Sequence, residues 1–240
     1  MAGHSKWANI QHRKNAQDAK RGKLFTKLIR AITVAARGSP IPETNPRLRL
    51  AIDKALSACV TKEAIERAIK RSFVAHDTDS LEEIRYEGYG PHGIAVLIEA
   101  LTDNRNRTVA EIRHAFSKAG GSLGSTGSVA YLFMQKGCIT LAPGADEPLV
   151  FDQAVVAGAD DVLAHDDGSM DVLTEPSLLA EVRTVLSQLN LTIADAELTW
   201  IAQTKISLTV EERNSIERLI DVLEDLDDVQ AVYVNMNDDE

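Results

Sequence analysis

Residues 83–102, EIRYEGYGPHGIAVLIEALT, mark the place where the hydrophobic pattern of the chain changes from helical to strand-like. Apolar and polar side chains alternate at first, glycine and proline follow, and the stretch ends in an almost continuous apolar run. This pattern predicts a β-hairpin. The glycines match G-x-G-x-x-G over residues 88–93, but a dinucleotide-binding loop needs a helix directly after it, and here a strand is expected.

The chain before the hairpin is predicted to be helical. Residues 19–37 place cationic and apolar side chains on opposite sides of a 3.6-residue period, and Gly38-Ser39-Pro40 ends that helix. A second helix is expected to begin at Pro46 with Asn45 as its N-cap, and a third follows the N-cap Thr61. The residues expected on the inner side of the second helix are Leu48, Ile52, Ala55, Leu56 and Cys59.

The chain after the hairpin mixes helices and strands. A capping box at Thr108–Glu111 predicts a helix that ends near Gly120, and SVAYLFM at 128–134 predicts a strand. Residues 136–202 have the expected order βαββαβ, the ferredoxin-like arrangement. A last helix, followed by a strand at 229–234, can complete the sheet that the hairpin begins.

Together these elements predict an α+β protein of several domains. We expect an N-terminal helical bundle over residues 1–77, a central α+β domain made of 78–133 plus 203–240, and a ferredoxin-like acidic domain, 134–202, inserted into it. No apolar run approaches the roughly 18 residues of a membrane span, so no membrane partner and a cytoplasmic location are expected. The two cysteines are far apart in the sequence and are expected to be buried and reduced.

Charge is distributed very unevenly along the chain. Residues 1–75 hold 16 Lys/Arg and 5 Asp/Glu, whereas residues 144–240 hold 4 and 23. Such a break is typical of a nucleic-acid-binding segment joined to segments with another role, although a solvated basic helix face or an organellar transit peptide would also be basic. The candidate nucleic-acid contacts are His4, Lys6, Trp7, Asn9, His12, Arg13, Lys14, Lys20, Arg21, Lys23, Lys27 and Arg30.

Other polar clusters give weaker signals. Arg105 and Arg107 lie near a predicted helix start, where they would make secondary phosphate contacts or surface ion pairs. The six histidines lack the spacing of a shared metal site, and no nucleophile elbow occurs, so no metal, cofactor or catalytic residue is expected. A nuclease that uses Asp166 and Asp167 with a metal, and a protein-interaction scaffold, are the alternatives from other classes.

Several motifs resemble the YebC/PmpR family, which includes the mitochondrial activator of cytochrome c oxidase translation. They run in order along nearly the whole chain and include MAGHSKWANI, YEGYGP, LTDNRNRT, GSVAYLF and LIDVLEDLDDVQ. Because the family motif begins at Met1, the resemblance implies that the basic arm belongs to the mature protein. The chain departs from the family pattern at GSPIPET after the first helix, at Ser72, and at His92, which replaces a glycine.

The resemblance also implies a function. Bacterial members are described as DNA-binding transcriptional regulators without catalytic activity, and many members are placed on the ribosome, where they assist synthesis through proline-rich stretches. We therefore expect a non-enzymatic regulator that binds double-stranded DNA, with ribosomal RNA and the ribosome as the alternative partner. Both polymers present phosphates, so the basic segment alone does not choose between them.

Overall fold

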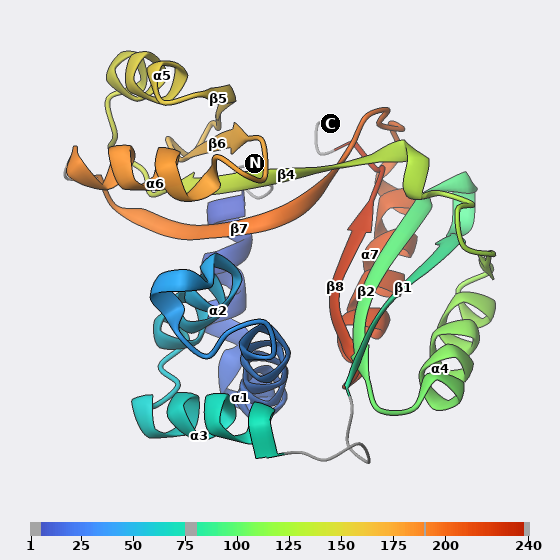
Figure 1. Ribbon diagram of the computed structural model, residues 1–240. Helices are drawn as coiled ribbons and strands as arrows, with labels where there is room; N and C mark the ends of the chain where they lie inside the picture. Colours follow the sequence, from blue (N-terminus) through green and yellow to red (C-terminus); the bar gives the residue numbers. More distant parts are fainter. Residues whose placement is uncertain (1–5, 75–80, 190, 238–240) are drawn as a thin grey trace. The chain divides into compact units, whose positions relative to one another are not determined.

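The computed structural model describes residues 6–74, 81–189 and 191–237, and within the first range it describes the side chains of Trp7 and of residues 22–72. The protein is an α+β protein with two four-stranded sheets (Figure 1). The chain divides into two compact units, residues 22–134 with 201–240 and residues 1–21 with 135–200. The domain boundaries expected after residues 77, 133 and 202 stay predictions.

Three helices precede the first sheet. They are α1 (Lys6–Ala36), α2 (Pro46–Ser57) and α3 (Lys62–Val74). The first begins at Lys6 rather than at residue 19, because the polar residues before Ala19 continue the same helix. Asn45 is the N-cap of α2, as predicted, and its Oδ1 accepts a hydrogen bond of 3.0 Å from the backbone N–H of Leu48. The buried core of this part consists of Leu28, Ile32, Ala35, Ala36, Leu48, Ala55, Val60, Ile65 and Ala68.

The predicted burial of Leu56 and Cys59 is wrong. Leu56 is 41% exposed, and Cys59 is also exposed. The helix ends at Ser57, so Cys59 lies beyond it and adopts a left-handed φ of 63°. A left-handed residue after a helix turns the chain away, so the helical period no longer decides where the Cys59 side chain points. Leu56 lies inside α2, about 100° around the helix from the buried Ala55, and this takes it off the buried side.

The first sheet has the strand order β3-β1-β2-β8. The hairpin is confirmed: β1 (Glu82–Tyr89) pairs antiparallel with β2 (Ala95–Thr102). The strand β8 (Val229–Val234) returns from the end of the chain and pairs with the other edge of β2, as the sequence predicts, and the short β3 (Ser122–Leu123) borders β1. The side chains of β2 are buried at almost every position and therefore on both faces of the sheet, in agreement with its nearly continuous apolar run.

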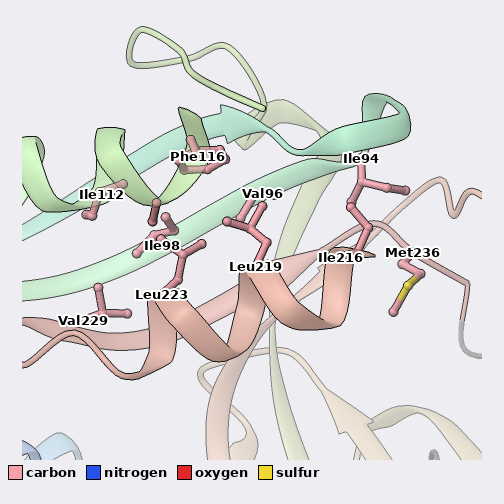
Figure 2. Close-up of a cluster of buried hydrophobic side chains, with 11 residues drawn as sticks. Ile94, Val96, Ile98, Ile112, Phe116, Ile216, Leu219, Leu223, Val229 and Met236 are labelled. Carbon is pink, nitrogen blue, oxygen red and sulfur yellow. The ribbon is translucent and has the colours of Figure 1, made fainter. Parts of the chain in front are cut away.

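Two helices pack on this sheet, α4 (Arg105–Lys118) and α7 (Val210–Glu224). Figure 2 shows Ile112 and Phe116 of α4 and Leu219 and Leu223 of α7 directed toward the β2 side chains between them. The whole buried cluster is Ile94, Val96, Ile98, Ile112, Ala115, Phe116, Ile216, Leu219, Leu223, Val229 and Met236.

Two local predictions around α4 are wrong. The helix begins one turn before the predicted capping box, and its N-cap is Asn104, whose Oδ1 accepts from the backbone N–H of Arg107 at 3.1 Å. Thr108 is instead buried inside the first turns of the helix. The predicted strand at 128–134 is a 3-10 turn, Ala130–Leu132, and the strand begins only at Phe133.

The second sheet has the order β5-β6-β4-β7. Its elements follow one another as βαββαβ, in agreement with the predicted sequence of elements. They are β4 (Phe133–Leu141), α5 (Glu147–Val156), β5 (Ala159–Ala164), β6 (Met170–Thr174), α6 (Leu179–Gln188) and β7 (Ile193–Ala202).

The glycines of the G-x-G-x-x-G stretch have structural roles. A Cβ on Gly88 would lie 2.7 Å from the carbonyl oxygen of Ser122 and 2.8 Å from Phe116 Cζ, so only glycine allows β1 to approach β3 and α4. Gly93 has a φ of 75°, and its neighbour His92 has a φ of 59°, which is uncommon for a residue with a side chain. A strand follows the stretch, as predicted.

Candidate nucleic-acid interface

Most of the candidate contacts predicted from the sequence lie in the first half of α1. Trp7 is half-buried, and His4 lies outside the described residues. The helix includes the following residues, whose side chains are outside the described part: Lys6, Asn9, His12, Arg13, Lys14, Lys20 and Arg21. One continuous helix of 31 residues therefore connects these positions to the cationic residues Lys23, Lys27 and Arg30, whose side chains are described.

Those three cations contact residues 224–228, EDLDD, which we call the acidic turn. Lys23 Nζ lies 3.1 Å from Asp225 Oδ2 and donates to the backbone carbonyl of Asp225 at the same distance. Lys27 Nζ donates to the carbonyl of Glu224 at 2.6 Å. Burial lowers the pKa of Lys27, although the nearby carboxylates act in the opposite direction. Predicted phosphate contacts are thus engaged with carboxylates and carbonyls of the same chain.

The acidic turn needs these cations for a reason that is visible in α7. The last turn of α7, Asp221–Glu224, contains two acids and no base, and Asp225 follows as the C-cap. The C-terminal end of a helix carries partial negative charge and unpaired carbonyls, so acids there are unfavourable and cations are favourable. The side chains of α1 therefore supply the positive charge that α7 itself lacks.

Asp228 is the buried centre of the contact. Its carboxylate is only 2% exposed; Oδ1 accepts from Arg30 at 2.8 Å, and Oδ2 accepts from Arg107 at 2.7 Å. Oδ2 also accepts from the hydroxyls of Thr108, at 2.7 Å, and Thr102, at 3.1 Å. Burial by itself raises the pKa of Asp228, but these hydrogen bonds outweigh it and hold the pKa below its ordinary value. The ionised carboxylate of Asp228 therefore connects α1, α4 and β2 through hydrogen bonds.

The secondary phosphate contacts predicted at Arg105 and Arg107 are also engaged within the chain. Arg105 forms an ion pair with Glu82, and Arg107 bonds to Asp103 at 2.8 Å in addition to Asp228. The hydrogen bonds from Arg107 to Asp228 and Asp103 raise the pKa of Arg107 further, so its charge is fixed. The ion-pair interpretation of this cluster accounts for both side chains.

The structure also presents exposed cations that were not among the candidates. They lie on α2 and α3 and are Arg47, Arg49, Lys54, Lys62, Arg67, Lys70 and Arg71. Some have contacts within the chain: Arg47 pairs with Glu83, and Arg67 donates to the carbonyl of Glu63 at 3.3 Å. The sequence could have indicated the cations of α3, because Arg67, Lys70 and Arg71 fall within one third of a turn of each other on this helix.

Among the side chains that the structure describes, Trp7 and residues 22–72, 81–189 and 191–237, no group of three or more His, Cys, Asp or Glu could hold a metal ion. In the same ranges, no helix combines the length and the apolar character that crossing a membrane requires.

The fold and the charge distribution define a class of protein: an α+β protein with a basic N-terminal helical segment and an acidic remainder. The chain belongs to the TACO1/YebC family. The model of the N-terminal domain of the TACO1/YebC protein matches residues 5–73, and the model of the second and third domains matches residues 81–236. The resemblance seen in the sequence is therefore confirmed.

Named relatives are similar over almost their full length. The transcriptional regulatory protein PmpR of Pseudomonas aeruginosa is 56% identical over 236 residues, which cover 98% of this chain and 95% of that protein. A probable transcriptional regulatory protein of Methylococcus capsulatus is 61% identical over the same shares. The crystal structure of a conserved hypothetical protein from Aquifex aeolicus has a TM-score of 0.84 and 44% identity, with 92% of this chain and 91% of that chain covered.

Proposed function

We propose that the protein is a non-enzymatic transcriptional regulator that binds double-stranded DNA through its N-terminal helical segment. The observation that carries the proposal is the net charge of +11 over residues 1–75, in a protein whose total formal charge is -10. A surface with this charge releases counterions from DNA and binds it largely independently of sequence. The names of the relatives support a role in transcription, since PmpR is called a transcriptional regulatory protein.

The proposed contact surface is the first half of α1, residues 6–21. Lys23, Lys27 and Arg30 continue the same helix, but they are engaged with the acidic turn. Arg105 and Arg107 are left out of the proposed surface, because Glu82, Asp103 and Asp228 already neutralise them. The acidic residues 144–240 would be repelled by DNA, and this polarity orients the basic end toward the duplex.

The proposal is tested by the salt dependence of duplex binding. If about six phosphates are contacted, log K falls with log salt at a slope of about -5. The double variant Lys14→Glu, Lys20→Glu should reduce the slope by about 2 and weaken binding to all duplexes. The matched control Arg113→Glu, Lys118→Glu changes two exposed cations of α4 and should leave the slope unchanged. A flat salt response of the full chain, or equal losses in both variants, contradicts the proposal.

Ribosomal RNA is the alternative polymer that presents phosphates, and a competition experiment distinguishes it from DNA as the partner. A regulator of transcription should prefer its own promoter over random duplex by a clear factor at fixed physiological salt. If all duplexes compete equally and the protein sediments with ribosomes in a salt-sensitive manner, the ribosome takes the place of DNA in this proposal.

A further inference from the structure

The second half of the α1 cationic face is covered by carboxylates of its own chain. Lys23, Lys27 and Arg30 are spaced i, i+4, i+7 and therefore share one side of the helix. The acidic turn, 224–228, offers four carboxylates within five residues on that side, together with the carbonyls of Glu224, Asp225 and Asp227 as acceptors. Carboxylate and phosphate oxygens accept hydrogen bonds from the same ammonium and guanidinium donors, so the acidic turn and a phosphodiester backbone would compete for them.

The contact is graded from an exposed edge to a buried centre. At the edge, the Lys23 side chain is 48% exposed, and its partners Asp225 and Asp227 are 46% and 71% exposed. Exposed ion pairs of this kind contribute little to stability and are screened by salt. At the centre, Arg30 contacts Asp228, whose side chain is 2% exposed and holds three further hydrogen bonds. Removal of that partner would leave charge unpaired in a poorly solvated place, so the centre resists opening.

We propose that the acidic turn is an internal competitor of nucleic acid: a phosphodiester backbone bound along α1 displaces Asp225 and Asp227 from Lys23 and exposes Lys27, while Arg30 and Asp228 stay paired. The inference rests on the proposed function, because it describes how access to the same surface is limited.

The competitor has a consequence for selectivity. When a single small anion replaces a carboxylate at a cation, one ionic interaction is exchanged for another, and the net gain is small. A polymer that already contacts several cations adds further ones without a further loss of translational freedom. The acidic turn should therefore discriminate against small phosphates and short oligonucleotides more strongly than against long duplexes. A contact that only fixes the helices to the sheet would show no such discrimination.

The test compares two variants of the full chain that remove the same amount of negative charge. Asp225→Asn with Asp227→Asn opens the edge of the contact and leaves Asp228 unchanged. Glu111→Gln with Glu211→Gln is the control, since both glutamates are exposed on α4 and α7. The affinity for a 20-base-pair duplex at 0.1 M salt should rise about fivefold more in the first variant than in the control. Circular dichroism and the midpoint of thermal unfolding check that both variants are folded.

A further substitution, Lys23→Gln, tests whether the gain in duplex affinity depends on Lys23. Lys23→Gln should weaken duplex binding more in the Asp225→Asn, Asp227→Asn background than in the unchanged chain, because in that background the ammonium binds phosphate without first losing its carboxylate partners. If the unchanged chain binds duplex with a steep salt slope but the two acid variants gain equally, or the gain survives Lys23→Gln, the competitor is overturned and the proposed function stands. If neither the unchanged chain nor the variants bind duplex in a salt-dependent manner, both proposals are overturned.

Discussion

The guanidinium of Arg107 donates to Asp228 Oδ2 at 2.7 Å, across 121 positions of the sequence. The same carboxylate also accepts from Arg30, so its removal leaves two cations and two threonine hydroxyls without this acceptor. We expect Asp228→Ala to lower the free energy of unfolding by about 3 kcal/mol, since removing one partner of a buried ion pair is costly. Urea denaturation followed by circular dichroism measures the loss. Asp227→Ala changes the exposed neighbour and should cost less than about 0.5 kcal/mol; equal losses would contradict the central role of Asp228.

The same carboxylate predicts a dependence of stability on pH. The pKa of Asp228 lies below its ordinary value of 3.8 in the folded protein, so the folded state favours the ionised form. Its contribution is fully present above about pH 4 and is lost as the pH falls through the lower folded value. The difference in unfolding free energy between the unchanged chain and Asp228→Asn should therefore be constant from pH 7 to 5 and shrink toward pH 2. A difference that stays constant down to pH 2 would contradict a depressed pKa.

Glu87 determines the conformation of the loop before β4. Its buried carboxylate accepts hydrogen bonds of 2.7 Å from the backbone N–H groups of Gly127, Val129 and Ala130. Burial raises the pKa of Glu87, but the three backbone donors outweigh burial and lower it.

Glu87→Gln replaces one accepting oxygen by a donor that faces backbone N–H groups. We expect a loss of about 2 kcal/mol and faster amide hydrogen exchange at Gly127, Val129 and Ala130. The exposed Glu111→Gln serves as the control and should change neither quantity. Unchanged exchange at the three amides would show that the loop is held by other contacts.

The hairpin and the strand at the end of the chain could be predicted from the sequence, because each shows a local pattern of apolar residues. The pairing of that strand with β2 joins distant parts of the chain, and the sequence indicates it only as a way to complete the sheet. The caps were harder to predict. Asn45 was identified because Pro46 follows it, whereas Asn104 was missed because Thr108 and Glu111 imitate a capping box one turn later. Thr108 is needed elsewhere, since its hydroxyl is bonded to Asp228. The residues of a local motif do not show that one of them is hydrogen-bonded to a carboxylate far away in the sequence.

The candidate interface shows the same limit. The cationic face of α1 is visible as a helical period, but the partners of Lys23 and Lys27 lie about 200 residues away in the acidic turn. Spacing indicates which residues share a face, and only the fold decides whether that face meets solvent, nucleic acid or another part of the chain. The acids at the end of α7 were the available signal, because a helix that ends in Asp and Glu needs cations from outside itself.

The turn between β1 and β2 contains a residue in a strained conformation. His92 has a φ of 59° and a ψ of 17°, the left-handed region, and its family counterpart in the resemblance is glycine. Its ring contacts α7: Nε2 lies 3.2 Å from Ser215 Oγ, and Nδ1 lies 3.4 Å from Glu212 Oε1. Both contacts are partly exposed, so they offset the strain only in part.

We therefore expect His92→Gly to raise the free energy of unfolding by about 0.5–1 kcal/mol, because glycine adopts the left-handed region without a Cβ penalty. His92→Asn should fall between the two, since asparagine tolerates this region better than most residues. His92→Ala removes the ring contacts and keeps the Cβ, so it should be the least stable of the series. Thermal unfolding at pH 8 gives the order, and an alanine variant as stable as the glycine variant would show that backbone strain at His92 contributes nothing.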